Sequence, residues 1–252
     1  QGKKLNCLGP QHPFKKFGKS GQSIAEIFPH IGSVADDICI VRSLRTKAIN
    51  HDPAHTFMNT GTTISGRPSM GAWMLYGLGS EAENLPGFVV MTSTGGGQSQ
   101  PIASRQWHSG FLPGQYQGVH FNSTGDPVLY VRNPKGVNNA NQRDIVDTAG
   151  ALNRLRSRQV GDPEIDTRIS QYELAFRMQS AAPEAVDLGK ESQQTLDAYG
   201  VGKKPTDEFG KNCVIARRLV ERGVRFVQLY SGGGHLADTR DAHGSIEKNH
   251  GQ

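Results

Sequence analysis

The sequence predicts an α/β protein with a mostly parallel β-sheet that is flanked by helices. Three observations lead to this prediction. Residues 38–41 and 87–91 are short, continuous apolar runs, as expected of strands that are buried on both faces. Residues 208–222 carry apolar residues at helical spacing, and a further apolar run follows them at 224–230. Helices that alternate with strands in this way favour a parallel sheet covered by helices.

Composition narrows the class of protein. Of the 252 residues, 35% are hydrophobic and 20% are charged, which is typical of a globular protein with many loops. No apolar stretch approaches the roughly 18 residues of a membrane-spanning helix, so we expect no membrane span. The net charge is +5, but no aromatic residues are interleaved with the basic ones, so we do not expect nucleic-acid binding. A positive field would attract anionic esters.

The first part of the chain is expected to alternate between helices and strands. A capping-box pattern begins residues 23–37, which predicts a helix that Pro29 kinks or shortens. The strand at 38–41 follows. Pro53 suits the first turn of a helix over 53–60 that ends at Gly61. A second short helix is predicted over 69–77, ahead of the strand at 87–91.

The middle of the chain is expected to be a loop-rich insertion and then a helical region. Residues 93–141 are rich in Gly, Asn, Pro, Ser and Gln, and we expect long connections there with a short strand near 128–131. The helical region covers about 142–200, with helices over 143–158 and 163–179. The clear helix at 208–222 then ends at Gly223, just before the strand at 224–230.

The three cysteines show neither a metal-binding CxxC pattern nor a disulfide framework. Cys39 and Cys213 lie in apolar runs, whereas Cys7 does not. We therefore expect Cys39 and Cys213 to be buried as small hydrophobic residues.

Histidines gather after two of the predicted strands. The loop after 38–41 leads to His51 and His55, and the segment after 224–230 holds His235, Asp238, Asp241 and His243, with His250 slightly beyond. Because loops at the carboxyl ends of parallel strands converge beside the sheet, we expect these two groups to meet. Imidazole and carboxylate groups together suit zinc and other divalent metals in a hydrolytic site.

Each of these residues also has a simpler interpretation. His51 and His55 are four apart and can face one direction from a helix, but His51 and Asp52 could instead cap that helix while His55 lies on the surface. Asp241 and His243 could belong to a polar turn, and His250 could be a solvated helix residue. We assign His51 and His55 as candidate catalytic residues, and Asp241, His243, His51 and His250 as candidate metal ligands.

Several segments are long enough to be specific to one protein family. They are residues 50–61 (NHDPAHTFMNTG), 65–73 (SGRPSMGAW), 84–90 (NLPGFVV), 161–165 (GDPEI), 216–230 (ARRLVERGVRFVQLY) and 241–244 (DAHG). Through these segments the sequence resembles the bacterial domain-of-unknown-function 1501 family, over about residues 23–252. This family belongs with the alkaline phosphatase and sulfatase-like superfamily, and its members often carry export signals. The resemblance implies a periplasmic or secreted protein.

The resemblance also implies a doubly wound, alkaline phosphatase-like sheet with a metal site at its carboxyl edge. In sulfatases the nucleophile segment reads Cys/Ser-x-Pro-x-Arg and is followed by Thr-Gly. In this sequence His51-x-Pro53-x-His55 precedes Thr60-Gly61 at the same spacing. His51 would therefore stand in the place of the nucleophile, and His55 in that of the arginine. Since position 51 holds neither Cys nor Ser, a formylglycine mechanism is excluded.

The sequence departs from complete members of that family at both ends. They usually carry an upstream Gly-Gly-Pro-Ser segment and downstream Gly-Glu-Phe-Gly-Arg-Thr-Pro and Asp-His-His segments, none of which occurs here. By resemblance, those segments should supply further metal ligands. The sequence also starts at Gln1 and stops at Gln252 without an obvious terminal element. We therefore expect residues 1–252 to form a single α/β domain that is incomplete at both ends.

Two functions follow from these expectations. The first is hydrolysis of phosphate or sulfate esters by water that one or two divalent metal ions activate, with zinc the first choice and manganese or calcium as alternatives. The second is a non-catalytic, secreted binding protein for anionic ligands or glycans on the same fold. In either case the expected partner is a small anionic ester or a sulfated or phosphorylated glycan. The oligomeric state is not predicted.

Overall fold

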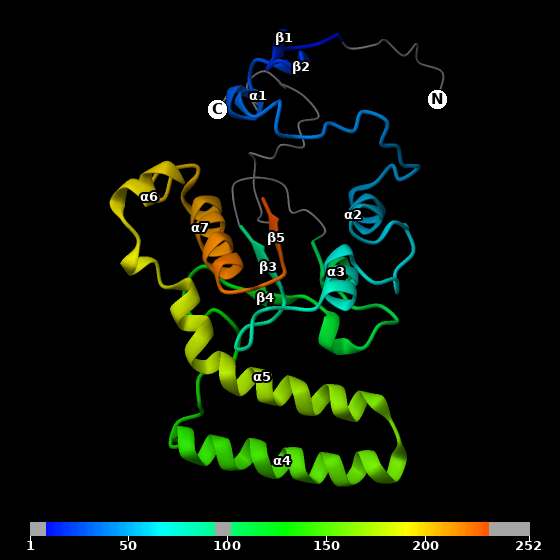
Figure 1. Ribbon diagram of the computed structural model, residues 1–252, viewed down its shortest axis with the longest axis vertical. Helices are drawn as coiled ribbons and strands as arrows, with labels where there is room; N and C mark the ends of the chain where they lie inside the picture. Colours follow the sequence, from blue (N-terminus) through cyan, green and yellow to red (C-terminus); the bar gives the residue numbers. More distant parts are fainter. Residues whose placement is uncertain (1–8, 94–101, 232–252) are drawn as a thin grey trace. The chain divides into compact units, whose positions relative to one another are not determined.

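A three-stranded parallel sheet lies at the centre of the larger part of the chain (Figure 1). In the computed structural model, which describes residues 9–93 and 102–231, the strand order is β4-β3-β5. The central strand β3 (Phe88–Thr92) pairs in parallel with β4 (Val119–Phe121) and with β5 (Phe226–Tyr230). The predicted strands at 87–91 and 224–230 and their parallel arrangement are therefore confirmed.

The described residues divide into two compact units, one over 9–47 and the other over 48–93 and 102–231, and each is described by itself. The larger unit holds the parallel sheet and all the helices from α2 onward. The smaller unit holds a two-stranded antiparallel sheet and one short helix.

Side chains of β3 are buried on both faces of the sheet. Phe88, Val89, Val90 and Met91 are all 0% exposed. Because successive side chains of a strand point to opposite faces, Val89 and Met91 enter one apolar cluster while Phe88 and Val90 enter another. This double burial explains why the strand has an unbroken apolar sequence.

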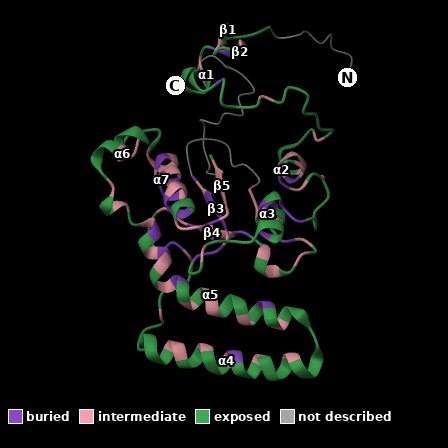
Figure 2. Ribbon diagram, viewed as in Figure 1, coloured by how far each residue is buried: buried purple, intermediate pink, exposed green. Residues whose placement is uncertain are grey.

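Helices cover both faces of the sheet. Helix α7 (Asp207–Glu221) and the second half of α5 (Pro163–Val186) pack against Val89 and Met91. Helix α3 (Met70–Leu78) packs on the opposite face, together with residues of the short 3-10 turns η1 (Ser104–Gln106) and η2 (Gly114–Tyr116) and their surroundings. Figure 1 shows α7 and α3 on opposite sides of the strands, and Figure 2 shows the buried residues concentrated between them. The predicted α/β class with a helix-flanked parallel sheet is confirmed.

Two helices predicted near the start of this unit form as expected. Helix α2 (His51–Thr60) ends at Gly61, whose φ of 75° is the left-handed conformation that glycine adopts without strain. Helix α3 begins after Ser69, whose side chain accepts a hydrogen bond from the backbone N–H of Ala72 at 3.3 Å. The helix predicted over 53–60 begins two residues earlier than expected, and the one predicted over 69–77 begins and ends one residue later.

The predicted helical region forms a long antiparallel hairpin. Helix α4 (Asn139–Val160) and helix α5 pack against each other, and α5 is followed by η3 (Leu188–Lys190) and the short α6 (Gln193–Ala198). Gly161 ends α4 with φ 71°, and the side chain of Asp162 caps α5 by accepting from the N–H of Glu164. Across residues 9–93 and 102–231, no helix combines the length and apolar character needed to cross a membrane.

A charged cluster joins the end of α5 to α7. The nearly buried guanidinium of Arg218 donates to the carboxylate of Glu191 at 2.7 Å and to the carbonyl oxygens of Glu184 and Ala185 at 2.9 Å. Arg217 donates to the other oxygen of Glu191 at 2.6 Å. Hydrogen bonds from Arg217 and then Arg218 lower the pKa of Glu191, so this carboxylate is charged at neutral pH. The cluster therefore holds the chain after α5 against α7.

The helix predicted over 23–37 is wrong. Strands β1 (Phe14–Phe17) and β2 (Gln22–Ala25) pair antiparallel, and only α1 (Pro29–Ser33) is helical. Proline has no N–H to donate into a preceding helical turn, so it begins a helix here instead of continuing one. Residues 22–25, which precede the proline, form backbone hydrogen bonds with β1 instead.

Three further predictions from the sequence are wrong. Residues 38–41 form no strand, Ile38 and Val41 are 39% and 55% exposed, and Cys39 is exposed rather than buried. A strand that is buried on both faces needs a pairing strand and elements that cover both faces, and no strand in the described ranges pairs with this run. The strand expected near 128–131 is a turn, in which the N–H of Val131 donates to the carbonyl oxygen of Val128. The strand of this region is β4.

Gly71 allows α3 to lie directly on the sheet, which leads to a stability prediction. A Cβ atom at Gly71 would lie 2.5 Å from ring atoms of Phe88 and 2.7 Å from Phe226, whereas one at Gly77 of the same helix would meet nothing within 4 Å. We expect Gly71→Ala to lower the free energy of unfolding by about 1–3 kcal/mol through overpacking. Gly77→Ala should raise it by about 0.5–1 kcal/mol through helix propensity. Urea unfolding measures both, and equal effects of the two changes would contradict this packing.

Candidate functional site at the strand ends

Polar and aromatic side chains gather beside the carboxyl ends of the three strands, on the face that α3 covers. We call this group the strand-end cluster; it consists of Asn59, Thr92, Trp107, His120, Gln228 and Tyr230. Three of them, Thr92, His120 and Tyr230, lie in the last two residues of their strands. Carboxyl ends of parallel strands are where α/β proteins commonly bind ligands.

Asn59 connects helix α2 to strand β5. Its buried side chain accepts hydrogen bonds through Oδ1 from the amide nitrogen of Gln228 and from the hydroxyl of Tyr230, the latter at 3.2 Å. Its Nδ2 donates to the carbonyl oxygen of His55, one turn earlier in α2, at 2.8 Å. The amide of Gln228 also donates to the Tyr230 hydroxyl at 2.8 Å. These bonds hold the second half of α2 beside β5.

Tyr230 keeps its proton at neutral pH. Burial raises the pKa of its phenol to about 12, and the hydrogen bonds from the phenol to Asn59 and from Gln228 only partly oppose this. The phenol is therefore a hydrogen-bond donor throughout the physiological range. Its single O–H donates to the Asn59 amide oxygen and so helps to hold α2 beside β5.

His120 is a neutral imidazole inside the cluster. Its Nε2 lies 3.1 Å from the Thr92 hydroxyl, and its ring stacks on Trp107 with ring centroids 6.1 Å apart. Trp107 also lies against Tyr230, with centroids 6.0 Å apart. Burial lowers the pKa of His120, so the uncharged form, which can accept a proton, dominates at neutral pH.

The candidate catalytic residues His51 and His55 lie on α2 one turn apart. Their ring centroids are 6.4 Å apart in an edge-to-face arrangement; His51 is exposed and His55 is half-buried. Asp52, between them, forms an ion pair with Arg105 of η1. Helix α2 is therefore anchored at its start through Asp52 and near its end through Asn59. The structure places both imidazoles on a helix that is fixed to the sheet.

The other predicted site residues are not placed by the structure. Asp241, His243 and His250, together with His235 and Asp238, lie outside the described residues. Within residues 9–93 and 102–231, no group of three or more His, Cys, Asp or Glu side chains is arranged to hold a metal ion. The assignment of these residues as metal ligands stays a prediction.

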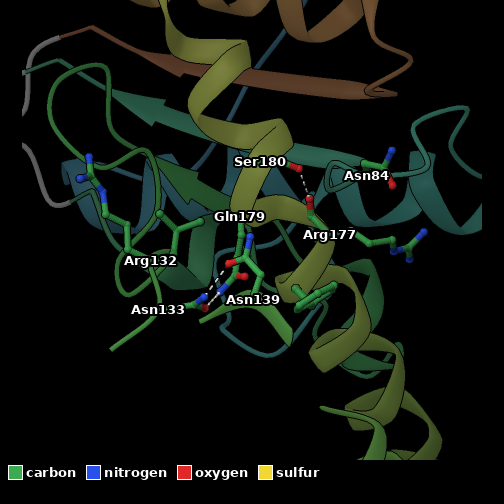
Figure 3. A pocket seen from close by; sticks show the side chains of 9 residues that line it. Asn84, Arg132, Asn133, Asn139, Arg177, Gln179 and Ser180 are labelled. Carbon is green, nitrogen blue, oxygen red and sulfur yellow. Dashed lines mark hydrogen bonds between the residues drawn. The ribbon is translucent and has the colours of Figure 1, made fainter. Parts of the chain in front are cut away.

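A cleft of about 540 Å³ lies beside α5 and shares no lining residue with the strand-end cluster. Its polar lining contains two arginines and four amides and no acidic residue: Arg132, Arg177, Asn84, Asn133, Asn139 and Gln179. Figure 3 shows the arginines at opposite ends of the group and three of the amides between them. Gln179 donates to Asn133 at 2.6 Å, and Asn133 donates to Asn139 at 2.8 Å.

Sequence reasoning missed most of the strand-end cluster. A usable signal existed for Gln228 and Tyr230, because two polar groups two residues apart in a predicted buried strand must share one face. His120 gave no such signal, since the strand that carries it was expected about ten residues further along. Asn59 lies at an ordinary helical position, and only its contact with β5 shows its role.

The environment of His120 predicts a pH dependence of stability. The folded-state pKa lies below the ordinary value of 6.5, so below that pH the unfolded chain binds the proton more readily. The contribution of His120 is fully present above about pH 6.5 and is lost as the pH falls toward the folded-state pKa. Wild type should therefore lose more stability than His120→Gln between pH 7 and pH 5 in urea unfolding. The exposed His30→Gln serves as control, and parallel curves for wild type and His120→Gln would refute this role.

The sequence matches the model of a known protein family. Residues 2–252 match the family described as protein of unknown function (DUF1501). No curated protein and no solved structure matches the sequence. Because the match covers almost the entire sequence, the resemblance seen in the motifs is confirmed at the level of the family. The chain belongs to the DUF1501 family.

Proposed function

We propose that this protein is a metal-dependent hydrolase of phosphate or sulfate esters that works at the strand-end cluster. The observation that carries the proposal is the attachment of α2 to β5 through Asn59. It brings the helix with His51 and His55 to the strand from which the chain continues toward Asp241 and His243. We further propose the doubly wound, alkaline phosphatase-like fold and the periplasmic or secreted location that the family resemblance implies.

The imidazole pair on α2 fits a divalent metal. Two histidines four residues apart on a helix are a recurrent arrangement of zinc ligands, and ring centroids at 6.4 Å need only modest side-chain rotation to bind one ion. Two ligands do not complete a site. We propose that Asp241, His243 and His250 supply the remaining ligands, with zinc the preferred ion and manganese or calcium as alternatives.

The chain's own groups would divide the work of hydrolysis. A divalent metal supplies polarisation of the ester oxygen and a lowered pKa for water. An imidazole of the His51–His55 pair that is not engaged as a ligand can take the proton of the attacking water. The protonated phenol of Tyr230 keeps the second half of α2 beside β5 through its hydrogen bond to Asn59, and the Arg105–Asp52 ion pair holds the first turn of α2 in position.

A second candidate function is non-catalytic binding of an anionic ligand or a sulfated or phosphorylated glycan. The cleft beside α5 favours it, because its two arginines and four amides can bind anionic groups and hydroxyls without opposition from a carboxylate in its lining. In that case the protein would bind a sulfated oligosaccharide without hydrolysing it. Arg177→Ala, and not a change of His51, would weaken that binding.

The hydrolase proposal predicts the behaviour of two histidine variants. His51→Ala and His55→Ala should each lower turnover of an aryl phosphate or aryl sulfate by about 10²-fold or more and lower the bound metal measured by elemental analysis. Chelation should abolish turnover, and added zinc or manganese should restore it. The matched control is His108→Ala, an exposed histidine outside the cluster, which should retain activity. Wild-type turnover that resists chelation, or no turnover of either ester by the metal-loaded chain, would refute the proposal.

A further inference from the structure

The outward face of α4 carries an apolar stripe that no described element covers. Its members are Ile145, Thr148, Leu152 and Leu155, and the three aliphatic side chains are 54%, 63% and 57% exposed. Within the described part of the chain, α5 is the one element that packs extensively against α4, and Figure 2 shows the rest of α4 largely exposed. Three large aliphatic residues in a row on an exposed helix face are characteristic of an interaction surface.

The stripe is not the face that α4 uses for α5. On that other face, two N–H groups of the Arg143 guanidinium donate hydrogen bonds to the carboxylate of Glu173 at 2.8 and 2.9 Å. The same guanidinium lies 4.8 Å from the centre of the Phe176 ring. Near the opposite end of α4, the Ser157 hydroxyl donates to Asp166 of α5 at 3.1 Å. The hairpin is therefore held together independently of the stripe.

The stripe has the spacing of a helix–helix seam. Its four positions follow one another at intervals of three, four and three residues, as in the core of a coiled coil. The pattern is also symmetric about position 150. In two antiparallel copies, Ile145 of one copy would lie opposite Leu155 of the other, and Thr148 opposite Leu152.

Charges along one edge of the stripe are arranged symmetrically about position 151, one residue from the centre of the stripe. Asp144, Ala151 and Arg158 are seven residues apart and follow one another along that edge. In an antiparallel pair, Asp144 of each copy faces Arg158 of the other, while the small Ala151 residues meet at the twofold axis. Neither Asp144 nor Arg158 forms an ion pair with any described residue. A parallel pair would place the two Asp144 side chains at the same end and leave both complementary pairs unmade.

We propose that two copies of this chain associate through antiparallel α4 helices, with this stripe as the seam. A second copy is the occupant because the charge pattern complements itself, with Asp144 near one end of the stripe and Arg158 near the other. The contact covers only about three turns of helix. We therefore expect a dimer that depends on protein concentration.

Sedimentation equilibrium of the full chain over a range of concentrations tests the proposal. Leu152→Arg should raise the dissociation constant at least about 30-fold, because it places a charge at the centre of the seam. Thr148→Leu should lower the dissociation constant, an effect that a folding defect cannot produce. Circular dichroism should be unchanged for both variants, since both positions are exposed.

Charge exchange tests the antiparallel register. Asp144→Arg and Arg158→Asp should each weaken the dimer, and the double variant should restore it. Arg168→Asp, on the other helix of the hairpin, is the control and should have no effect. A wild-type chain that stays monomeric up to its solubility limit would overturn the proposal. So would a dimer that Leu152→Arg leaves intact, or binding to anionic vesicles without self-association.

Discussion

The buried side-chain amide of Asn59 holds helix α2 to strand β5, and the candidate site depends on this contact. The amide oxygen accepts from Gln228 and Tyr230, and the amide nitrogen bonds back to the carbonyl of His55. A buried amide without a hydrogen-bond partner lowers the free energy of unfolding, so the loss of any one member of the network leaves the others with unsatisfied polar groups. This network brings residues that are about 170 positions apart in the sequence into direct contact.

The core of the fold follows from patterns that the sequence shows directly. The apolar run of β3 is unbroken because helices cover both of its faces, and the amphipathic α7 leads into β5 through a glycine turn. Apolar runs, amphipathic spacing and capping residues can each be read from a few neighbouring residues, without knowing which distant segments they contact. The same holds for α2, α4 and α5, whose ends are set by Gly61, Asn138 and Asp162.

Elements whose identity depends on distant partners could not be predicted in this way. The run at 38–41 is as apolar as β3, but it has no pairing strand within the described ranges and stays irregular and exposed. Strand β4 is only three residues long and exists because β3 offers it a free edge. The importance of Asn59 likewise comes from its contact with β5. His51 and His55 could be singled out from their type and spacing, whereas Thr92, His120 and Trp107 come together only in the folded chain.

A double-mutant cycle between Asn59 and Tyr230 tests the central claim that α2 is held to the end of β5. The free energy of unfolding would be measured for wild type, Asn59→Ala, Tyr230→Phe and the double variant. Since the phenol donates to the Asn59 amide oxygen, we predict a coupling energy of about 0.5–1.5 kcal/mol between the two changes. Strictly additive effects would mean that the two side chains do not interact, and the attachment of α2 to β5 would lose its basis.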